Sequence, residues 1–302
     1  MGTFVQQTTW GWMIAAYLFL GGLGGAVGAI GIGIDLYLEP HRRMGIFAAL
    51  SGFVFLAAGT LLLMLDLLQP LKVVFFFMNP SSWIFWGILT ISGFMVTSVL
   101  YVLPYIKTWP LVDRVAPYLS FLDRWQRWAG LASVLLGAGV TAYTGFLISG
   151  VPAISFWHTA GLPLLFSFSA FSTGCAYLML TRWLLYRREG SLCQKLKRAD
   201  AVLIVGELIV LAAFYNTVTC CPAAAQYGTR LLLHSAGFVV GFLLLGLLVP
   251  LVIELISIAA PERVDGWKFS TYLWPVIGVL ILIGGFLLRV YTMQAGYYTY
   301  PW

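Results

Sequence analysis

Charged residues are scarce in this chain of 302 residues. They make up 9% of the sequence, against 61% for hydrophobic residues, whereas a soluble domain carries about 25% charged residues. The polar side chains are too few to coat a water-soluble surface, so the chain must expose apolar surface to lipid. Lipid admits only helices or a closed barrel, and the apolar runs are too long for barrel strands and lack their two-residue alternation.

Cysteine and histidine are also rare. The four cysteines show no ligand spacing, and two of them, Cys220 and Cys221, are adjacent, which suits neither a disulfide between them nor one metal ion. Of the three histidines, only His158 and His234 fall near the same side of the membrane, so they could ligate at most one haem. A haem pair that spans both leaflets is excluded. We therefore expect no metal and no haem in this chain.

Eight apolar runs are long enough to cross a bilayer, which takes about 20 residues per helix. They predict an all-α integral membrane protein with spans at 12–36, 46–68, 83–106, 128–150, 158–185, 201–220, 231–256 and 273–291. The connections between the runs are short, so no separate soluble domain is expected. The aromatic tail, residues 296–302, is typical of an anchor at the membrane surface.

Lysine and arginine gather on one side of the predicted membrane. Of the 17 basic residues, only Lys72, Arg230 and Arg289 fall on the other side, which leaves 14 in the connections after the odd-numbered spans. Cytoplasmic loops are rich in Lys and Arg, so both termini are expected outside, with a multi-pass chain in the cytoplasmic (inner) membrane. The basic residues of these loops account for the net charge of +6. The positive charge therefore does not indicate a nucleic-acid partner.

Glycines recur four residues apart in the first run, at Gly21 and Gly25 and again at Gly24 and Gly28. This spacing places small residues on one face of a helix and lets a neighbouring helix approach closely. A phosphate-binding glycine loop would follow a strand in a soluble context, which is missing here. We therefore expect tight helix packing.

Ionisable residues within the apolar runs are costly in lipid and mark candidate sites. Asp66 is expected near the outer end of the second run, and Arg289 is buried in the last one. Arg289 stays charged and needs a partner, and Asp66 is the expected one, either as a purely structural pair or as the wall of a polar pocket. Lys72 is expected at the rim of that pocket or on a docking surface.

Two glutamates lie deeper in the predicted membrane. Glu207 is well inside the sixth run, so it needs a partner or a proton, whereas Glu254 lies near the cytoplasmic end of the seventh run. Both are candidates for a proton route, and an internal hydrogen-bond network is the alternative for Glu207. A capping role near the basic loops is the alternative for Glu254.

The chain carries no redox centre of its own, because it lacks cluster-binding cysteines and a flavin-binding fold. If it takes part in redox chemistry, its substrate is a carrier that diffuses within lipid, and a quinone fits. A quinone headgroup requires a few hydrogen-bond donors and one protonatable residue near the surface. The stretch 65–87, with Asp66, Trp83 and Trp86, is expected to roof such a pocket on the outer face.

Several short motifs occur along the chain in the order found in a known family. They are Tyr17-Leu-Phe-Leu-Gly-Gly, Asp66-Leu-Leu-Gln-Pro, Asn79-Pro-Ser-Ser-Trp, Tyr143-Thr-Gly, Phe156-Trp-His-Thr-Ala-Gly-Leu-Pro and Gly284-Gly followed by Leu288-Arg. Each motif alone has low specificity, but together they extend over essentially the whole chain. The sequence resembles the NrfD/PsrC-type membrane subunits of polysulfide, thiosulfate and related reductases.

This resemblance implies a haem-free, quinone-reactive membrane anchor built from two four-helix bundles, at residues 1–150 and 151–302. Such an anchor binds menaquinone or ubiquinone near the outer face and serves anaerobic respiration. The resemblance also implies an iron–sulfur partner subunit on that face, with [4Fe–4S] clusters, which passes electrons to or from a catalytic subunit that is often molybdopterin-dependent. The enzyme is then the multi-subunit oxidoreductase.

The resemblance also suggests site residues. In the polysulfide reductase member a tyrosine of the fourth helix contacts the quinone, and Tyr143 matches it. The expected catalytic residues are Tyr143, Asp66 and Arg289. An Asn/His pair that the family has on its first helix is not evident here, where Gln7, Trp10 and Trp12 stand instead. His158 and Asp66 are the candidates for the second quinone contact, and Trp10 is also expected in the quinone-binding site.

Two other functions stay open at this point. A proton-coupled secondary transporter would use Glu207 and Glu254 as proton sites, although such transporters typically have paired helix breaks at the midplane. A structural anchor without quinone chemistry is the other alternative. The catalytic partner, the terminal substrate and the direction of electron flow do not follow from the sequence.

Overall fold

The computed structural model describes residues 4–38, 42–66, 79–108, 121–186, 191–220, 222–260 and 270–299. Helices dominate these residues, and eight of them are long and apolar enough to cross a membrane. The predicted all-α membrane fold is therefore confirmed. Lys72 and Cys221 lie outside the described residues.

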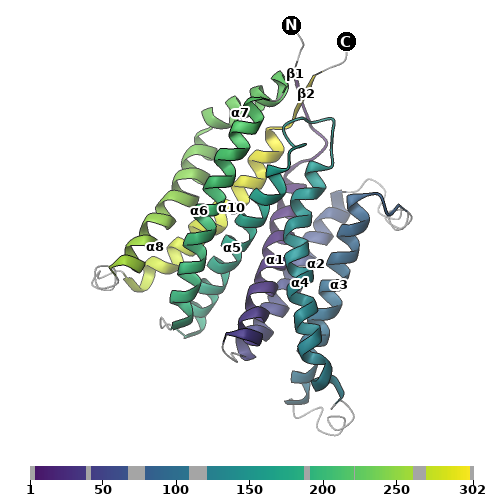
Figure 1. Cartoon of the computed structure of the whole chain (residues 1–302), viewed down its shortest axis with the longest axis vertical. Coiled ribbons are helices and arrows are strands. Elements are labelled where there is room, and N and C mark those ends of the chain that lie inside the picture. The colour runs from purple at the N-terminus through teal and green to yellow at the C-terminus, as the bar shows by residue number, and fades with distance from the viewer. Residues whose placement is uncertain are drawn as a thin grey trace.

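The elements follow one another as β1 (Phe4–Gln6), α1 (Trp12–Tyr37), α2 (Arg42–Asp66), α3 (Trp83–Val102), η2 (Leu103–Thr108), α4 (Phe121–Ser149), α5 (Gly161–Tyr186), α6 (Ser191–Thr219), α7 (Ala223–His234), η4 (Gly237–Leu248), α8 (Val249–Ala259), α10 (Ser270–Gln294) and β2 (Tyr297–Thr299). Both termini lie at the same end of the molecule (Figure 1). We call it the terminal end, where α1 begins and α10 ends, and we call the other the opposite end.

The helix α1 lies at the centre of the molecule and packs against α2, α4, α5 and α10. Its glycines meet glycines of its neighbours. A Cβ atom on Gly24 would lie 2.8 Å from the carbonyl oxygen of Gly52 in α2, and one on Gly25 would lie 2.6 Å from that of Gly137 in α4. The helix backbones are therefore in contact, which confirms the tight packing predicted from the glycine spacing.

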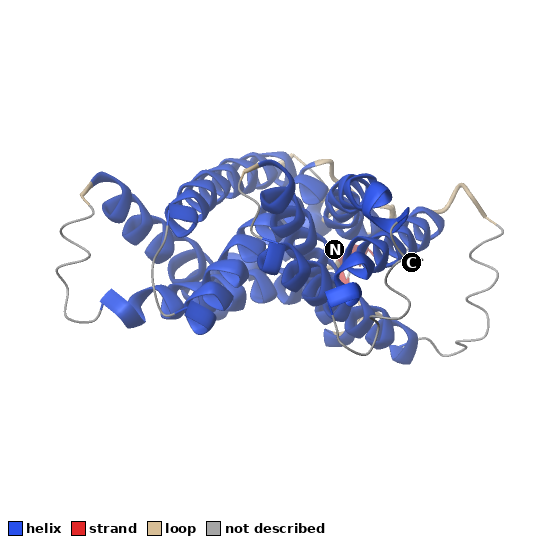
Figure 2. Ribbon diagram, turned by 90° about the horizontal axis from the view of Figure 1, so that it is seen from below, coloured by secondary structure: helices blue, strands red, loops and turns tan. Residues whose placement is uncertain are grey.

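The helices form two groups that lie side by side (Figures 1 and 2). The first group is α1 to α4. The second group is α5, α6, η4, α8 and α10, with the short α7 at the terminal end. The helix α5 packs against both α1 and α4, so the two groups share an extensive contact. The boundary between residues 150 and 151 stays a prediction.

Large apolar side chains cover the outside of the described helices. Leu135 is 73% exposed and Val202 is 71% exposed. In water such a surface would be unstable, but in a bilayer it faces acyl chains, and the backbone hydrogen bonds are closed within the helices. Buried positions hold the polar groups instead, among them Arg289 and Glu207.

The structure corrects three boundaries. The helix α6 begins at Ser191, ten residues before its predicted start at residue 201. The seventh span begins at Gly237 rather than at residue 231, because Ser235 is extended and separates α7 from the π-helical segment η4. Within the predicted aromatic tail, Tyr297–Thr299 form the strand β2, which pairs antiparallel with β1.

Candidate functional site

Two tyrosines face each other inside the first group, close to the terminal end. Tyr17 of α1 is 1% exposed and Tyr143 of α4 is 6% exposed, and their hydroxyl groups interact. Tyr17 lies five residues after the start of α1 and Tyr143 six residues before the end of α4. At 1.5 Å per residue both lie about 8 Å below the helix ends.

Glycines form the walls around this tyrosine pair. A Cβ atom on Gly87 of α3 would lie 1.9 Å from Cζ of Tyr143, so only glycine leaves room for the phenol ring. A Cβ atom on Gly59 of α2 would lie 3.5 Å from Cδ2 of Tyr17. Neither tyrosine hydroxyl bonds to a backbone carbonyl within the described residues. Because one hydroxyl donates to the other, one O–H of the pair stays free to donate to a ligand.

Two exposed aromatic rings stack between α3 and α4 on the terminal-end side of Tyr143. Trp83, at the start of α3, stacks on Phe146 of α4 with ring centroids 4.7 Å apart. A Cβ atom on Gly150 would lie 2.6 Å from Cδ1 of Trp83, so the indole ring covers the end of α4. Ser82 caps α3 by accepting a hydrogen bond from the backbone N–H of Ile84 at 3.2 Å. Residues 67–78 of the predicted roof at 65–87 lie outside the described residues, so the roof over the tyrosines stays a prediction.

Asp66 is the last residue of α2 and is partly exposed at the terminal end. It makes no hydrogen bond or ion pair with the other described residues. The segment that follows it, residues 67–78, lies outside the described residues. Asp66 therefore shares the terminal end with Tyr143, and the structure shows no direct contact between the two.

His158 lies exposed in the connection between α4 and α5, also at the terminal end. Its Nδ1 atom is 2.7 Å from the backbone oxygen of Ser149, the last residue of α4. A carbonyl oxygen only accepts, so Nδ1 carries the proton and Nε2 is the free atom of the neutral ring. His158 is thus attached to the helix that carries Tyr143, on its solvent-facing side.

Trp10 is engaged in packing. Its indole stacks on Trp157, with ring centroids 5.3 Å apart and an interplanar angle of 17°. Trp157 is buried and donates through Nε1 to the backbone oxygen of Thr292 at 2.8 Å. The backbone N–H of Trp10 donates to Oε1 of Gln7 at 2.9 Å. Through Trp157, Trp10 therefore connects the residues just before α1 to the end of α10.

Arg289 is fully buried at the contact between the two groups. Its Nη1 donates to Oγ of Ser169 at 2.7 Å and to the backbone oxygen of Gly285 at 2.8 Å, and its Nη2 donates to that of Phe166 at 3.1 Å. No ion pair joins it to Asp66, although both residues are described. The predicted Asp66–Arg289 pair is not formed, because α10 packs against α5 and α1 while Asp66 ends α2.

Glu207 of α6 supplies the negative charge near Arg289. The carboxylate is 1% exposed, and it interacts electrostatically with Arg289 and with the hydroxyl of Ser169. Ser169 accepts from Arg289, so its own proton is free to be donated toward Glu207. The three side chains form one buried network, which supports the internal-network alternative for Glu207 without excluding proton transfer.

A second buried cluster is not predicted from the sequence. Asp200 of α6 and Glu254 of α8 are both 0% exposed and lie against each other, with Ser172 of α5 facing Asp200. Asp200 is absent from the candidate residues because the sixth span is predicted to begin after it. The available signal is the spacing of seven residues between Asp200 and Glu207, which places two acidic side chains on one face of a helix.

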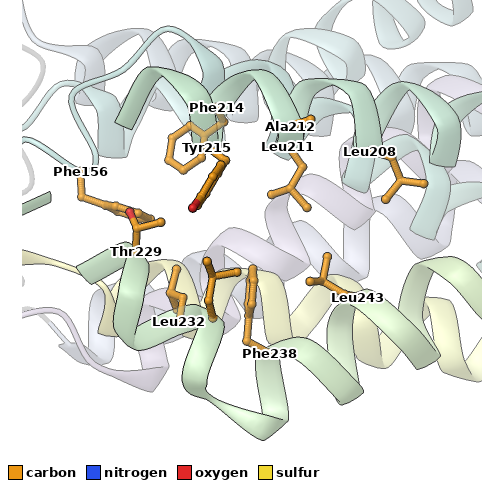
Figure 3. A pocket seen from close by; sticks show the side chains of 11 residues that line it. Phe156, Leu208, Leu211, Ala212, Phe214, Tyr215, Thr229, Leu232, Phe238 and Leu243 are labelled. Atoms are coloured by element: carbon orange, nitrogen blue, oxygen red, sulfur yellow. The ribbon is translucent and has the colours of Figure 1, made fainter. Parts of the chain in front are cut away.

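Two further cavities lie away from the tyrosine pair among the described residues. One is apolar, about 250 Å³, and opens between α6 on one side and α7 with η4 on the other (Figure 3). Its lining side chains include Leu211, Phe214 and Phe238. The other is polar, about 360 Å³, at the opposite end of the first group, where Tyr101 donates to the carboxylate of Asp35.

The sequence is similar to known proteins along most of its length. The chain is 30% identical to the C subunit of polysulfide reductase from Wolinella succinogenes over 315 aligned positions, which cover 98% of this chain and 97% of that protein. It is 27% identical to the protein NrfD of Escherichia coli, over 70% of this chain and 71% of that one. An NrfD homologue of Haemophilus influenzae is 24% identical over 96% of this chain and 95% of that protein.

The comparison with protein families covers the chain almost from end to end. The model of the family described as polysulphide reductase, NrfD, matches residues 3–301. The resemblance inferred from the short motifs is thereby confirmed. The chain is a multi-pass membrane protein that belongs to the NrfD family of polysulphide reductase membrane subunits.

Proposed function

We propose that this chain is the quinone-reactive membrane subunit of a respiratory oxidoreductase. It exchanges electrons and protons between a membrane quinone, menaquinone or ubiquinone, and an iron–sulfur partner subunit docked on the terminal end. The chain contributes the quinone pocket and the proton-transferring side chains. The electrons pass directly between the quinone ring and a cluster of the partner, so they need no path through the helices.

The tyrosine pair carries this proposal. Tyr17 and Tyr143 bond to each other and keep one O–H free to donate, about 8 Å below the ends of α1 and α4, in surroundings that are otherwise apolar. The absence of a side chain at Gly87 leaves room for the ring of Tyr143, and Trp83 stacks on Phe146, three residues after Tyr143 on α4. A quinone carbonyl accepts hydrogen bonds, and a tyrosine hydroxyl can both donate one and relay a proton.

Proton exchange with water takes place nearer to the surface. Asp66 and His158 are two protonatable side chains at the terminal end, the end at which the tyrosine pair lies. His158 holds its proton on Nδ1 and presents Nε2 as a base. We assign both residues to proton exchange at the mouth of the pocket, and Lys72 to its rim or to the docking of the partner.

The partner and the orientation are inferred from the comparisons and the charge distribution. The relative from Wolinella succinogenes is named as one lettered subunit of a reductase, which indicates an assembly of several subunits in that protein. We extend this to an iron–sulfur subunit with [4Fe–4S] clusters and a catalytic subunit, of which a molybdopterin enzyme is the expected type. The 14 basic residues of the connections after the odd-numbered spans support a cytoplasmic location of the opposite end, with the terminal end outside the inner membrane.

Quinol-linked activity of the complete complex tests the proposal. Asp66→Asn is expected to lower quinol-linked turnover about 100-fold, the usual contribution of a proton-transferring side chain. Activity with a soluble artificial electron donor, which bypasses the pocket, stays at the wild-type level. The matched control is Asp35→Asn, the same chemical change at the opposite end of the first group. Equal quinol-linked rates in wild type and Asp66→Asn would refute the role of Asp66.

One observation favours the transporter alternative. Asp200, Glu207 and Glu254 form a buried acidic cluster of the kind that proton-coupled transporters use. If that function holds, the chain alone in vesicles moves a solute with protons and needs no partner subunit. If the chain is only a structural anchor, the purified complex binds no quinone.

A further inference from the structure

A groove separates α6 from η4 in the terminal-end half of the second group. The helix α6 packs against α7 toward the terminal end and against α8 toward the opposite end, whereas η4 packs chiefly against α10. Glycines hold η4 there, since a Cβ atom on Gly246 would lie 2.7 Å from Cα of Gly284 and one on Gly241 would lie 2.7 Å from Cδ1 of Leu287. The apolar cavity of about 250 Å³ is the space that remains between η4 and α6 (Figure 3). We call it the lateral groove, and its walls include Leu208, Leu211, Phe214, Thr229, Leu232 and Phe238.

The walls of the lateral groove offer water almost nothing to bind. Only Thr229 and Tyr215 among its lining residues carry a polar side chain, and the Thr229 hydroxyl donates to the backbone oxygen of Ala225 at 2.9 Å. A buried water needs two to four polar partners, and an apolar cavity of about 150 Å³ stays dry and takes up a molecule of the size of benzene. A larger apolar cavity beside lipid is therefore filled by hydrocarbon.

The lateral groove opens toward the surrounding membrane. Phe214 and Phe238 inside it are each 6% exposed, whereas Leu233 and Tyr215 at its rim are 42% and 46% exposed. Along α6 the groove extends from Tyr215 to Leu208, which is about 10 Å and about two-thirds of one leaflet of the bilayer core. Its length and its direction along the helix fit a single extended acyl chain.

The helix α7 covers the terminal end of the groove at the level where the membrane helices end. A Cβ atom on Gly228 of α7 would collide with the backbone oxygen of Ala295, the residue that follows α10. Tyr227 stacks on Phe4 of β1 with ring centroids 5.4 Å apart. Helix ends mark the boundary between the hydrocarbon core and the headgroups. The phosphate of a lipid whose chain enters the groove therefore lies at the level of α7.

Arg230 supplies a positive charge at this level. It is exposed on α7, directly after Thr229 and three residues before Leu233, so it borders the side of the helix that faces the groove. It makes no ion pair with the other described residues. Residues 208–248 contain no Asp or Glu, and Arg230 is their one Lys or Arg. The guanidinium, whose planar fork matches a phosphate, is thus left for an external anion.

We propose that the lateral groove binds one acyl chain of an anionic glycerophospholipid and that Arg230 binds the phosphate of the same lipid. The occupant is a phospholipid rather than the tail of a quinone, because a guanidinium selects an anion and a quinone headgroup is neutral. The lipid fills the gap between α6 and η4 and joins both to α7. This site lies in the second group and does not depend on the quinone function proposed above.

Native mass spectrometry of the purified full chain, titrated with phosphatidylglycerol, tests the role of Arg230. One molecule is expected to bind more tightly than phosphatidylcholine with the same chains, whose phosphate is neutralised by its own choline. Arg230→Gln is expected to weaken phosphatidylglycerol binding about 10-fold, because charge-assisted hydrogen bonds are lost. The matched control is Arg124→Gln, which removes an exposed charge at the opposite end and keeps the wild-type affinity. Equal affinity of wild type for the two lipids, or unchanged affinity in Arg230→Gln, would overturn the proposal.

Filling the lateral groove tests the acyl-chain site separately. Ala212 lines the groove and is exposed, so Ala212→Trp is expected to fill the space without entering the packed core and to lower phosphatidylglycerol binding at least 10-fold. Ala213→Trp is the matched control, because Ala213 is exposed on the next position of α6 and does not line the groove. Circular dichroism and thermal melting establish that both variants are folded. Wild-type binding in the folded Ala212→Trp variant contradicts the site.

A phosphatidylglycerol with a photoactivatable diazirine on its acyl chain locates the lipid. Labelled peptides are expected around Leu211 of α6 and Phe238 of η4, with labelling suppressed by unlabelled phosphatidylglycerol and unaffected by an equal concentration of menaquinone. Labelling only at other helices contradicts the proposal. Displacement of the probe by menaquinone would instead identify the groove as a site for a quinone tail and would likewise overturn it.

Discussion

Replacing Gly87 by alanine moves Tyr143 without changing any polar group. The added Cβ atom would lie 1.9 Å from Cζ of Tyr143, whereas an ordinary contact requires at least 3.4 Å. The ring must therefore shift by about 1.5 Å, and a displacement of about 1 Å at a reacting group lowers a rate about 100-fold. Overpacking of this kind also costs about 1–3 kcal/mol of stability. We expect quinol-linked turnover to fall about 100-fold, while artificial-donor activity is kept.

The matched control is Gly139→Ala on α4, one turn from Tyr143. Its Cβ atom would meet Thr90 at 3.7 Å, an ordinary contact, so this variant is expected to keep both activities. The assay compares kcat and KM for quinol in the purified complex, together with the thermal stability of each variant. A Gly87→Ala complex with the quinol kinetics of wild type would refute the assignment of the pocket to Tyr143.

Two further substitutions separate stability from catalysis. Arg289→Lys removes the guanidinium group and leaves Ser169 or a buried backbone carbonyl without its hydrogen-bond donor. We therefore expect the free energy of unfolding to fall by about 1–3 kcal/mol. Unchanged stability in a denaturant titration would contradict the buried network. Trp10→Ala removes the stack on Trp157, so we expect about 0.5–1.5 kcal/mol less stability beyond the loss of buried area, with an unchanged KM for quinol. A raised KM at unchanged stability would instead place Trp10 in the quinone site.

The membrane fold could be predicted because its signal is compositional. Runs of about 20 apolar residues are rare outside membrane-spanning helices, and the short charged connections separate them clearly. The close approach of α1 to its neighbours was likewise predictable from Gly24 and Gly25, because each has another glycine four residues away, and small residues at this spacing let membrane helices pack closely. Both features depend on local sequence alone.

The start of α6 could not be found in the same way. Its first turns carry Lys195, Lys197 and Arg198, which lower the local hydropathy and suggest a loop. In the structure these turns continue the helix, with Lys197 buried and its two basic neighbours exposed. The sequence therefore places Asp200 before the predicted sixth span and outside the candidate residues, although Asp200 forms part of a deeply buried polar cluster.

The partner of Arg289 depends on tertiary structure. From the sequence, Asp66 and Arg289 both fall toward the same face, and opposite charges attract. The packing decides otherwise, because α10 lies against α5 and brings Arg289 to Ser169 and, beyond it, to Glu207. Which helices adjoin is not encoded in the position of a residue along its own span.

Photoaffinity labelling of the complex with an azidoquinone tests the central claim most directly. The account predicts labelled peptides around Tyr143 of α4 and Gly87 of α3, with labelling suppressed by excess quinone and weakened in Tyr143→Phe. Labelling at the apolar cavity between α6 and η4, around Leu211 and Phe238, or no specific labelling at all, would contradict a quinone pocket at the tyrosine pair.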